Sequence, residues 1–136
     1  MEKNSALQWH PGFCAALRIT FREELEYLEM YEEYQLGKKP MQIDILIIKK
    51  TEKIAIKKSI GKIFRTYNII EYKSPNDFLN INDFYKVYGY TCFYQANTDK
   101  VMEIDPRELT ITFACSHYPG KMLRHLEETR GICVRI

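Results

Sequence analysis

The residues of this chain best suited to chemistry are two acids and one lysine that interrupt apolar segments. Asp44 stands inside the apolar run of residues 43–48. Glu71 and Lys73 stand two residues apart in the segment 67–75, so on a strand their side chains would leave the same face. Charged groups that face a core are rarely tolerated without a partner, a metal ion or a catalytic task. Asp44, Glu71 and Lys73 are therefore the candidate catalytic residues.

A purely structural explanation exists for part of this pattern. Glu71 and Lys73 alone would more often form an exposed ion pair on an edge strand, worth under about 1 kcal/mol. Asp44 favours a functional site instead, because it adds a second carboxylate in an earlier apolar run.

Two strands must position these residues. Residues 43–48 are β-branched and too few for a typical helix, and residues 68–72 form a similar run that Ser74 and Pro75 terminate. The preceding residues 27–36 form either a strand or the end of one long acidic helix. We favour strand, turn and strand, a hairpin, because residues 37–40 favour a sharp turn and the next run, residues 43–48, is β-branched and too short for a typical helix.

Helices are expected to flank these strands. Residues 11–25 keep apolar side chains and Glu24 at helical spacing, with a proline suited to the first turn. Residues 80–95 begin with good cap residues and carry an aromatic stripe. Gly89 in that stripe costs about 1 kcal/mol of helix propensity and indicates a point of close packing.

The end of the chain predicts a strand and a helix. Residues 109–115 alternate as a strand, and residues 119–130 form a short helix that Gly131 ends. Residues 132–136 begin a pattern typical of another strand and then stop, so we expect a chain truncated at its C-terminus. The predicted fold is α/β, with an α+β-like mixed central sheet flanked by helices, in one domain over residues 1–136.

Bulk composition is compatible with one packed domain. The chain has 136 residues, of which 46% are hydrophobic, enough for a single core. Its net charge of +2 neither demands nor excludes nucleic acid, because phosphate binding needs a local basic cluster. The scattered cysteines predict reduced core thiols, and neither a signal segment nor a membrane-spanning run is present, so we expect a soluble, cytoplasmic protein without membrane contact. The cysteines are Cys14, Cys92, Cys115 and Cys133.

The order of helix, hairpin, acid-bearing strand, Glu-x-Lys strand, helix and strand resembles the core of the PD-(D/E)XK nuclease superfamily. It is also similar to the bacterial, transposon-associated nucleases that promote recombination. The resemblance spans roughly residues 11–115 and is carried by Asp44 and by Glu71-Tyr72-Lys73, although Ile43 stands where a proline often precedes the aspartate. It implies a restriction-endonuclease-like fold and a Mg²⁺-dependent endonuclease, with Mn²⁺ as a substitute. Many members add a helical glutamate, for which Glu23, Glu24 and Glu33 all remain candidates.

Phosphodiester hydrolysis explains why these residue types would be needed. Asp44 and Glu71 form a hard-oxygen site suited to Mg²⁺, and the backbone carbonyl of Tyr72 is the expected third ligand because it lies between Glu71 and Lys73. Lys73 either orients or deprotonates the attacking water, or neutralises charge in the transition state. Nearby carboxylates favour a charged lysine while burial opposes it, and we favour the electrostatic role.

A basic segment between the two strands offers contacts for phosphates, or equally a solvated hairpin surface. It comprises Lys49, Lys50, Lys53, Lys57, Lys58, Lys62 and Arg65. Two other hypotheses remain beside a DNA nuclease: a nuclease-fold module that no longer cleaves and binds nucleic acid or a partner, and a small α/β protein without a site. DNA or RNA as substrate, and pairing of two copies as a homodimer, are left open.

Overall fold

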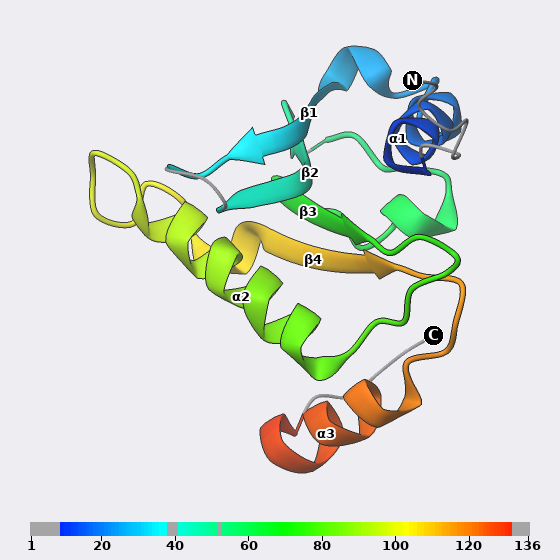
Figure 1. Cartoon of the computed structure of the whole chain (residues 1–136). Helices are drawn as coiled ribbons and strands as arrows, with labels where there is room; N and C mark the ends of the chain where they lie inside the picture. The colour runs from blue at the N-terminus through cyan, green and yellow to red at the C-terminus, as the bar shows by residue number, and fades with distance from the viewer. Residues whose placement is uncertain (1–8, 38–40, 52, 132–136) are drawn as a thin grey trace, which may run out of the picture.

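The computed structural model describes residues 9–37, 41–51 and 53–131. These residues form a mixed α/β structure with three α-helices and a four-stranded mixed sheet (Figure 1). The α-helices and strands are α1 (Trp9–Thr20), β1 (Leu28–Gln35), β2 (Gln42–Lys49), β3 (Tyr67–Tyr72), α2 (Ile81–Ala96), β4 (Leu109–Ala114) and α3 (Gly120–Arg130). Short 3₁₀ turns lie at Leu25–Tyr27, Ser59–Gly61 and Pro106–Glu108.

The sheet has the order β1-β2-β3-β4. The pairs β1–β2 and β2–β3 are antiparallel, whereas β3 and β4 are parallel and are connected through α2. The predicted hairpin is thus confirmed, and the alternative of one long acidic helix is wrong. Leu28 is buried at the start of β1 and the following side chains become exposed, as in an edge strand that pairs with the β-branched run of β2.

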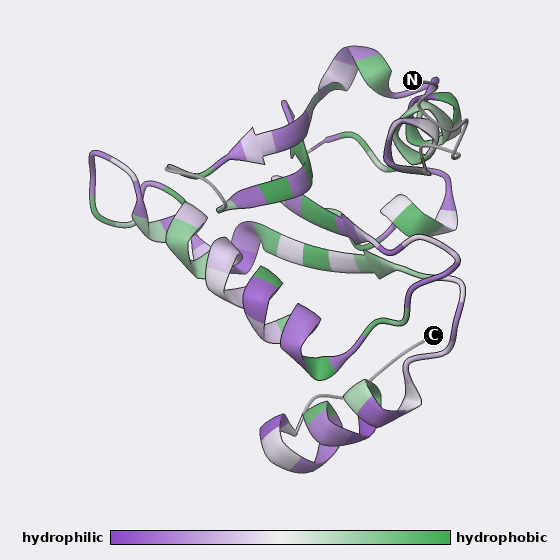
Figure 2. Ribbon diagram, viewed as in Figure 1, coloured by the Kyte–Doolittle hydropathy of each residue, from purple (hydrophilic) through white to green (hydrophobic). Residues whose placement is uncertain are grey.

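Helices cover the two faces of the sheet separately. On one face, Leu17 and Phe21 pack with Ile45, Ile47 and Ile70 in a cluster that also includes Cys14 of α1. On the other face, Leu46 and Ile69 pack against Val87 of α2. Hydrophobic colour accordingly follows β2, β3 and β4, while β1 is largely hydrophilic (Figure 2). The apolar side chains of the central strands are therefore buried on both faces of the sheet.

Two helices differ from their predicted form. The first helix ends at Thr20 rather than residue 25, because the chain must turn before β1, although Phe21 still packs into the core. Gly89 is exposed, and a side-chain carbon there would meet nothing within 4 Å, so its predicted role in close packing is wrong. Its helix α2 packs on the sheet through Val87 instead.

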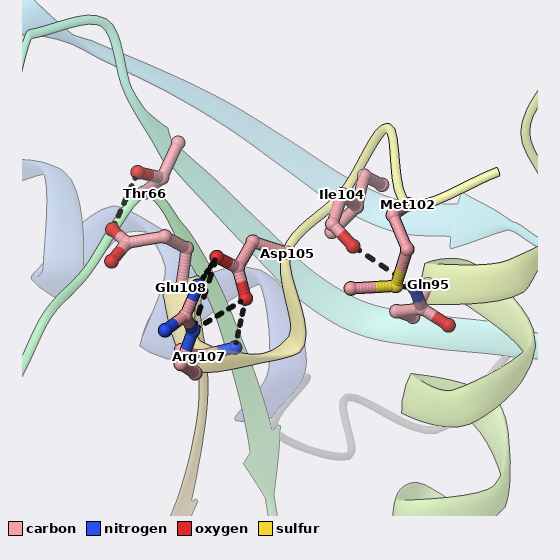
Figure 3. A network of polar contacts seen from close by, with 7 residues as sticks. All are labelled: Thr66, Gln95, Met102, Ile104, Asp105, Arg107 and Glu108. Carbon is pink, nitrogen blue, oxygen red and sulfur yellow. Dashed lines mark hydrogen bonds and ion pairs between the residues drawn. The ribbon is translucent and has the colours of Figure 1, made fainter. Parts of the chain in front are cut away.

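The connection from α2 to β4 is tied down by polar contacts (Figure 3). The side-chain amide of Gln95 donates to the carbonyl of Ile104 at 2.9 Å, which closes the loop onto the helix. The hydroxyl of Thr66 donates to the carboxylate of Glu108 at 2.9 Å. The bond between Thr66 and Glu108 joins the residues just before β3 and β4, which pair in the parallel register that places Glu71 opposite Phe113.

The predictions for the cysteines and for the C-terminal residues have different outcomes. Cys14, Cys92 and Cys115 are free thiols; Cys14 is buried as predicted, but Cys92 is exposed. Cys133 and the predicted strand 132–136 lie outside the described residues. Among the described helices, none has the length and apolar character needed to cross a membrane.

Candidate active site

The carboxyl groups of Asp44 and Glu71 converge where β2 and β3 stop pairing. At this end of the β2–β3 ladder, the last paired residues are Ile45 and Ile70. Asp44 directly precedes Ile45 and Glu71 directly follows Ile70, so both lie just beyond the last pair. An Oδ atom of Asp44 accepts a hydrogen bond from the backbone N–H of Tyr72 at 3.3 Å. Glu71 lies across from Asp44 just beyond the last pair of the ladder, and the charge of Asp44 acts on its carboxyl group. Two acids far apart in sequence thus form one half-buried pair.

The backbone of β1 is irregular beside this pair. Glu32 pairs with Ile45 and Tyr34 pairs with Ile43, but Glu33 between them has a φ of 50° and forms no regular pair with Asp44. A left-handed conformation at a residue other than glycine costs of order 1–3 kcal/mol, and such strain often accompanies functional sites. Local distortion at Glu33 coincides with the point where Asp44 leaves the regular ladder.

Repulsion within the pair changes the proton affinity of Glu71. Burial, followed by the charge of Asp44 and a hydrogen bond with its carboxyl, raises the pKa of Glu71 to about 8. Lys73 opposes this rise and Asp83 adds to it. Near neutral pH Glu71 therefore retains a proton, which a divalent cation could replace.

Tyr72 supplies a third oxygen on the same strand edge. Its N–H points to Asp44, and in an extended strand the N–H and C=O groups of one residue point to the same side. The Tyr72 carbonyl therefore faces the edge where β2 no longer pairs. The ring of Tyr72 stacks on Phe13 of α1, with ring centroids 4.3 Å apart, so α1 fixes the end of β3.

Lys73 lies on the side of α2 and has a partner that sequence reasoning missed. Its ammonium Nζ is 3.1 Å from Oδ1 of Asp83, in the first turn of α2. Its backbone N–H donates to the carbonyl of Ala114 at 2.9 Å, which keeps Lys73 aligned with the sheet. The only available signal for Asp83 was its place three residues after Asn80, as in a helix capping box.

None of the three expected glutamates joins the pair. Glu23 forms an exposed ion pair with Lys57 at 3.1 Å, Glu24 is buried beyond the end of α1, and Glu33 is exposed. Their positions leave Asp44, Lys73 and Asp83 as the charged groups that act most strongly on Glu71.

Glu32 instead approaches the α1 side of this region. It pairs with Arg18 at 3.3 Å. Burial, then the charge of Glu32, raises the pKa of Cys14 to about 11, and Asp44 adds to the effect. The thiol of Cys14 therefore stays protonated and serves as packing.

The basic segment lies mostly away from the carboxyl pair. Lys49, Lys62 and Arg65 line a hollow of about 520 Å³ at the end of β2 opposite to Asp44. A separation of five strand residues corresponds to about 16 Å. These side chains could reach phosphates only on a nucleic acid that extends along the sheet.

Among the residues described, no group of three or more histidine, cysteine, aspartate or glutamate side chains could hold a metal ion. The oxygen set consists of two carboxylates and the carbonyl of Tyr72. Comparison with protein-family models, with curated proteins and with solved structures finds no match to this chain. The functional argument therefore depends on the geometry of the site.

Proposed function

We propose that this protein is a metal-dependent nuclease of the PD-(D/E)XK type that hydrolyses phosphodiester bonds, with DNA as the expected substrate. The observation that carries the proposal is the convergence of Asp44 and Glu71 at the end of a strand pair, with Lys73 two residues beyond Glu71. The order of helices and strands is compatible with a restriction-endonuclease-like core. In the structure, α1 packs on one face of the sheet and α2 on the other.

The residues present fit Mg²⁺ or Mn²⁺. Carboxylate and carbonyl oxygens are the donors that such hard cations prefer, and Mg²⁺ usually keeps several waters rather than a full protein cage. Without a cation, burial and then the neighbouring charge of Asp44 raise the pKa of Glu71. Asp44, Glu71 and the Tyr72 carbonyl would hold the ion, which when bound would make a coordinated water more acidic and offset phosphate charge.

Lys73 supplies the fixed positive charge. Lys73 stands two residues after Glu71, and its positive charge lowers the pKa of Glu71. Hydrolysis of a phosphodiester develops negative charge on the phosphoryl oxygens, and a prepositioned cation stabilises that charge. The ammonium group of Lys73 is engaged with the carboxylate of Asp83 at 3.1 Å, an arrangement that suits electrostatic stabilisation better than proton abstraction.

Cleavage assays with a matched acid control test this function. Supercoiled plasmid, single-stranded DNA and RNA are incubated with the wild type, Asp44→Ala and Asp99→Ala, in Mg²⁺, Mn²⁺ or EDTA. Asp99 is an exposed acid of the loop that follows α2. We expect metal-dependent cleavage by the wild type and Asp99→Ala, and about a 1000-fold loss in Asp44→Ala, since metal assistance is worth several kcal/mol.

Two results would contradict the proposal. Cleavage by Asp44→Ala at the wild-type rate would exclude the carboxyl pair as the site. Stabilisation by Mg²⁺ without cleavage of any of the three substrates would instead favour a nuclease-fold module that binds nucleic acid but does not cut it.

A further inference from the structure

The ion pair between Lys73 and Asp83 links the candidate active site to the start of α2. Nζ of Lys73 and Oδ1 of Asp83 are 3.1 Å apart, and their side chains are 25% and 10% exposed. The two residues come from different elements, since Lys73 directly follows β3 and Asp83 lies in the first turn of α2. Lys73 is therefore restrained from the helix side of the site.

Asp83 is itself held in one orientation. Its Oδ2 accepts a hydrogen bond from the backbone N–H of Asn80 at 3.0 Å, while its Oδ1 faces Lys73. The side chain of Asn80 accepts in return from the backbone N–H of Asp83 at 3.1 Å, which completes a capping box. One carboxylate oxygen thus serves the helix and the other serves the lysine.

The stability of the protein does not by itself explain why residue 83 is a charged aspartate. An uncharged amide could provide the acceptor that the backbone N–H of Asn80 requires. A largely buried ion pair adds little net stability, because removal of both charges from water offsets most of their attraction. The negative charge of Asp83 is therefore the feature that needs another explanation, and that charge faces Lys73.

We propose that Asp83 is a positioning residue that holds the ammonium group of Lys73 beside the Asp44–Glu71 pair, without contacting the substrate itself. This inference rests on the proposed nuclease function, in which Lys73 stabilises charge on the phosphate. A lysine has a long flexible side chain, and a misplacement of about 1 Å can cost about 100-fold in rate. Asp83 would prevent such misplacement.

Steady-state cleavage by three variants tests the positioning role. Asp83→Asn keeps an acceptor for the cap but removes the charge, whereas Asn80→Ala weakens the cap and keeps both the ion pair and the backbone N–H that binds Asp83. We expect kcat to fall by about 100-fold in Asp83→Asn with KM for DNA within about twofold. Asn80→Ala should keep the wild-type kcat, and Asp83→Glu should recover part of the loss.

A measurement that does not need activity separates this inference from the proposed function. Acetylation of Lys73 in the metal-free protein, followed by mass spectrometry at one pH, should be several-fold faster in Asp83→Asn than in the wild type or Asn80→Ala. If the wild type does not cleave, the nuclease proposal fails while the labelling still tests the lysine restraint. Unchanged labelling in Asp83→Asn, unchanged kcat, or an equal loss of kcat in Asn80→Ala would overturn the role of Asp83.

Discussion

Asn68 and Glu71 are both polar residues of β3, but the groups that surround their side chains differ. Asn68 has no exposed surface, and its amide oxygen accepts from the N–H of Arg65 at 2.8 Å and from the hydroxyl of Thr110 at 2.7 Å. Its amide nitrogen donates to the carbonyls of Ile47 at 3.1 Å and Arg65 at 2.7 Å. The full hydrogen-bonding capacity of Asn68 is thus used to join β2, β3 and β4.

Glu71 lies three residues further along the same strand, yet its main neighbour is a second acid. Burial and Asp44 both disfavour its ionised form, and only Lys73 favours it. A satisfied buried group such as Asn68 specifies the fold, whereas an acid placed beside another acid lowers the stability of the metal-free protein. The contrast assigns Asn68 to the fold and supports the proposed functional role of Glu71.

The largest expected effect separates activity from stability at Glu71. Glu71→Gln should reduce metal-dependent plasmid cleavage by about 1000-fold, because the variant loses an anionic ligand worth several kcal/mol. Its melting temperature without metal should equal or exceed that of the wild type, since an amide removes the repulsion with Asp44. A marked drop in that melting temperature would show that Glu71 has a structural task like that of Asn68.

At Asn68, in contrast, a substitution is expected to reduce stability. Asn68→Ala leaves buried donors and acceptors without partners, each worth about 1–3 kcal/mol, so the free energy of unfolding should fall by about 3 kcal/mol or more. Urea denaturation measures this change, and Asn76→Ala at an exposed turn position should stay within about 0.5 kcal/mol of the wild type. A small loss of unfolding free energy in Asn68→Ala would show that the hydrogen bonds of Asn68 do not specify the fold.

The pH dependence of stability sharpens the contrast further. The pKa of Glu71 in the folded protein is raised to about 8 from an ordinary value of 4.5, so the folded state holds this proton more tightly than the unfolded state. Its contribution is present in full below the unfolded pKa and is lost as pH rises through the folded pKa. Without metal, the wild type should therefore lose stability between about pH 4.5 and 8 relative to Glu71→Gln. Parallel pH profiles of the two proteins in urea would exclude the raised pKa.

The smallest expected effect concerns a position that neither stabilises the core nor belongs to the site. Gly89 lies in the interior of α2, is exposed, and leaves at least 4 Å of open space around the place that a β-carbon would take. Gly89→Ala should raise the free energy of unfolding by about 0.5–1 kcal/mol through helix propensity, with cleavage unchanged. Thermal melting and plasmid cleavage measure both, and a destabilised variant would contradict the open surroundings of Gly89.

Local patterns in the sequence predicted most elements because each depends on near neighbours. The β-branched run of residues 43–48 became β2, the alternating residues 109–115 became β4, and Gly131 ends α3 with a φ of 62°. The first helix was predicted too long because residues 21–24 keep helical spacing although the chain turns there. Gly89 was misread because its sequence neighbours are aromatic, but they do not show which face of α2 contacts the sheet.

By itself, the sequence predicted that Glu71 and Lys73 lie two residues apart at the end of one strand and that an acid interrupts another apolar strand. Only the tertiary structure decided that Asp44 meets Glu71, because that contact depends on where the β2–β3 ladder ends. It also decided that Asp83 pairs with Lys73, since the start of α2 had to return to the end of β3. Periodicity is set by adjacent residues, whereas register and helix placement depend on packing of the whole sheet.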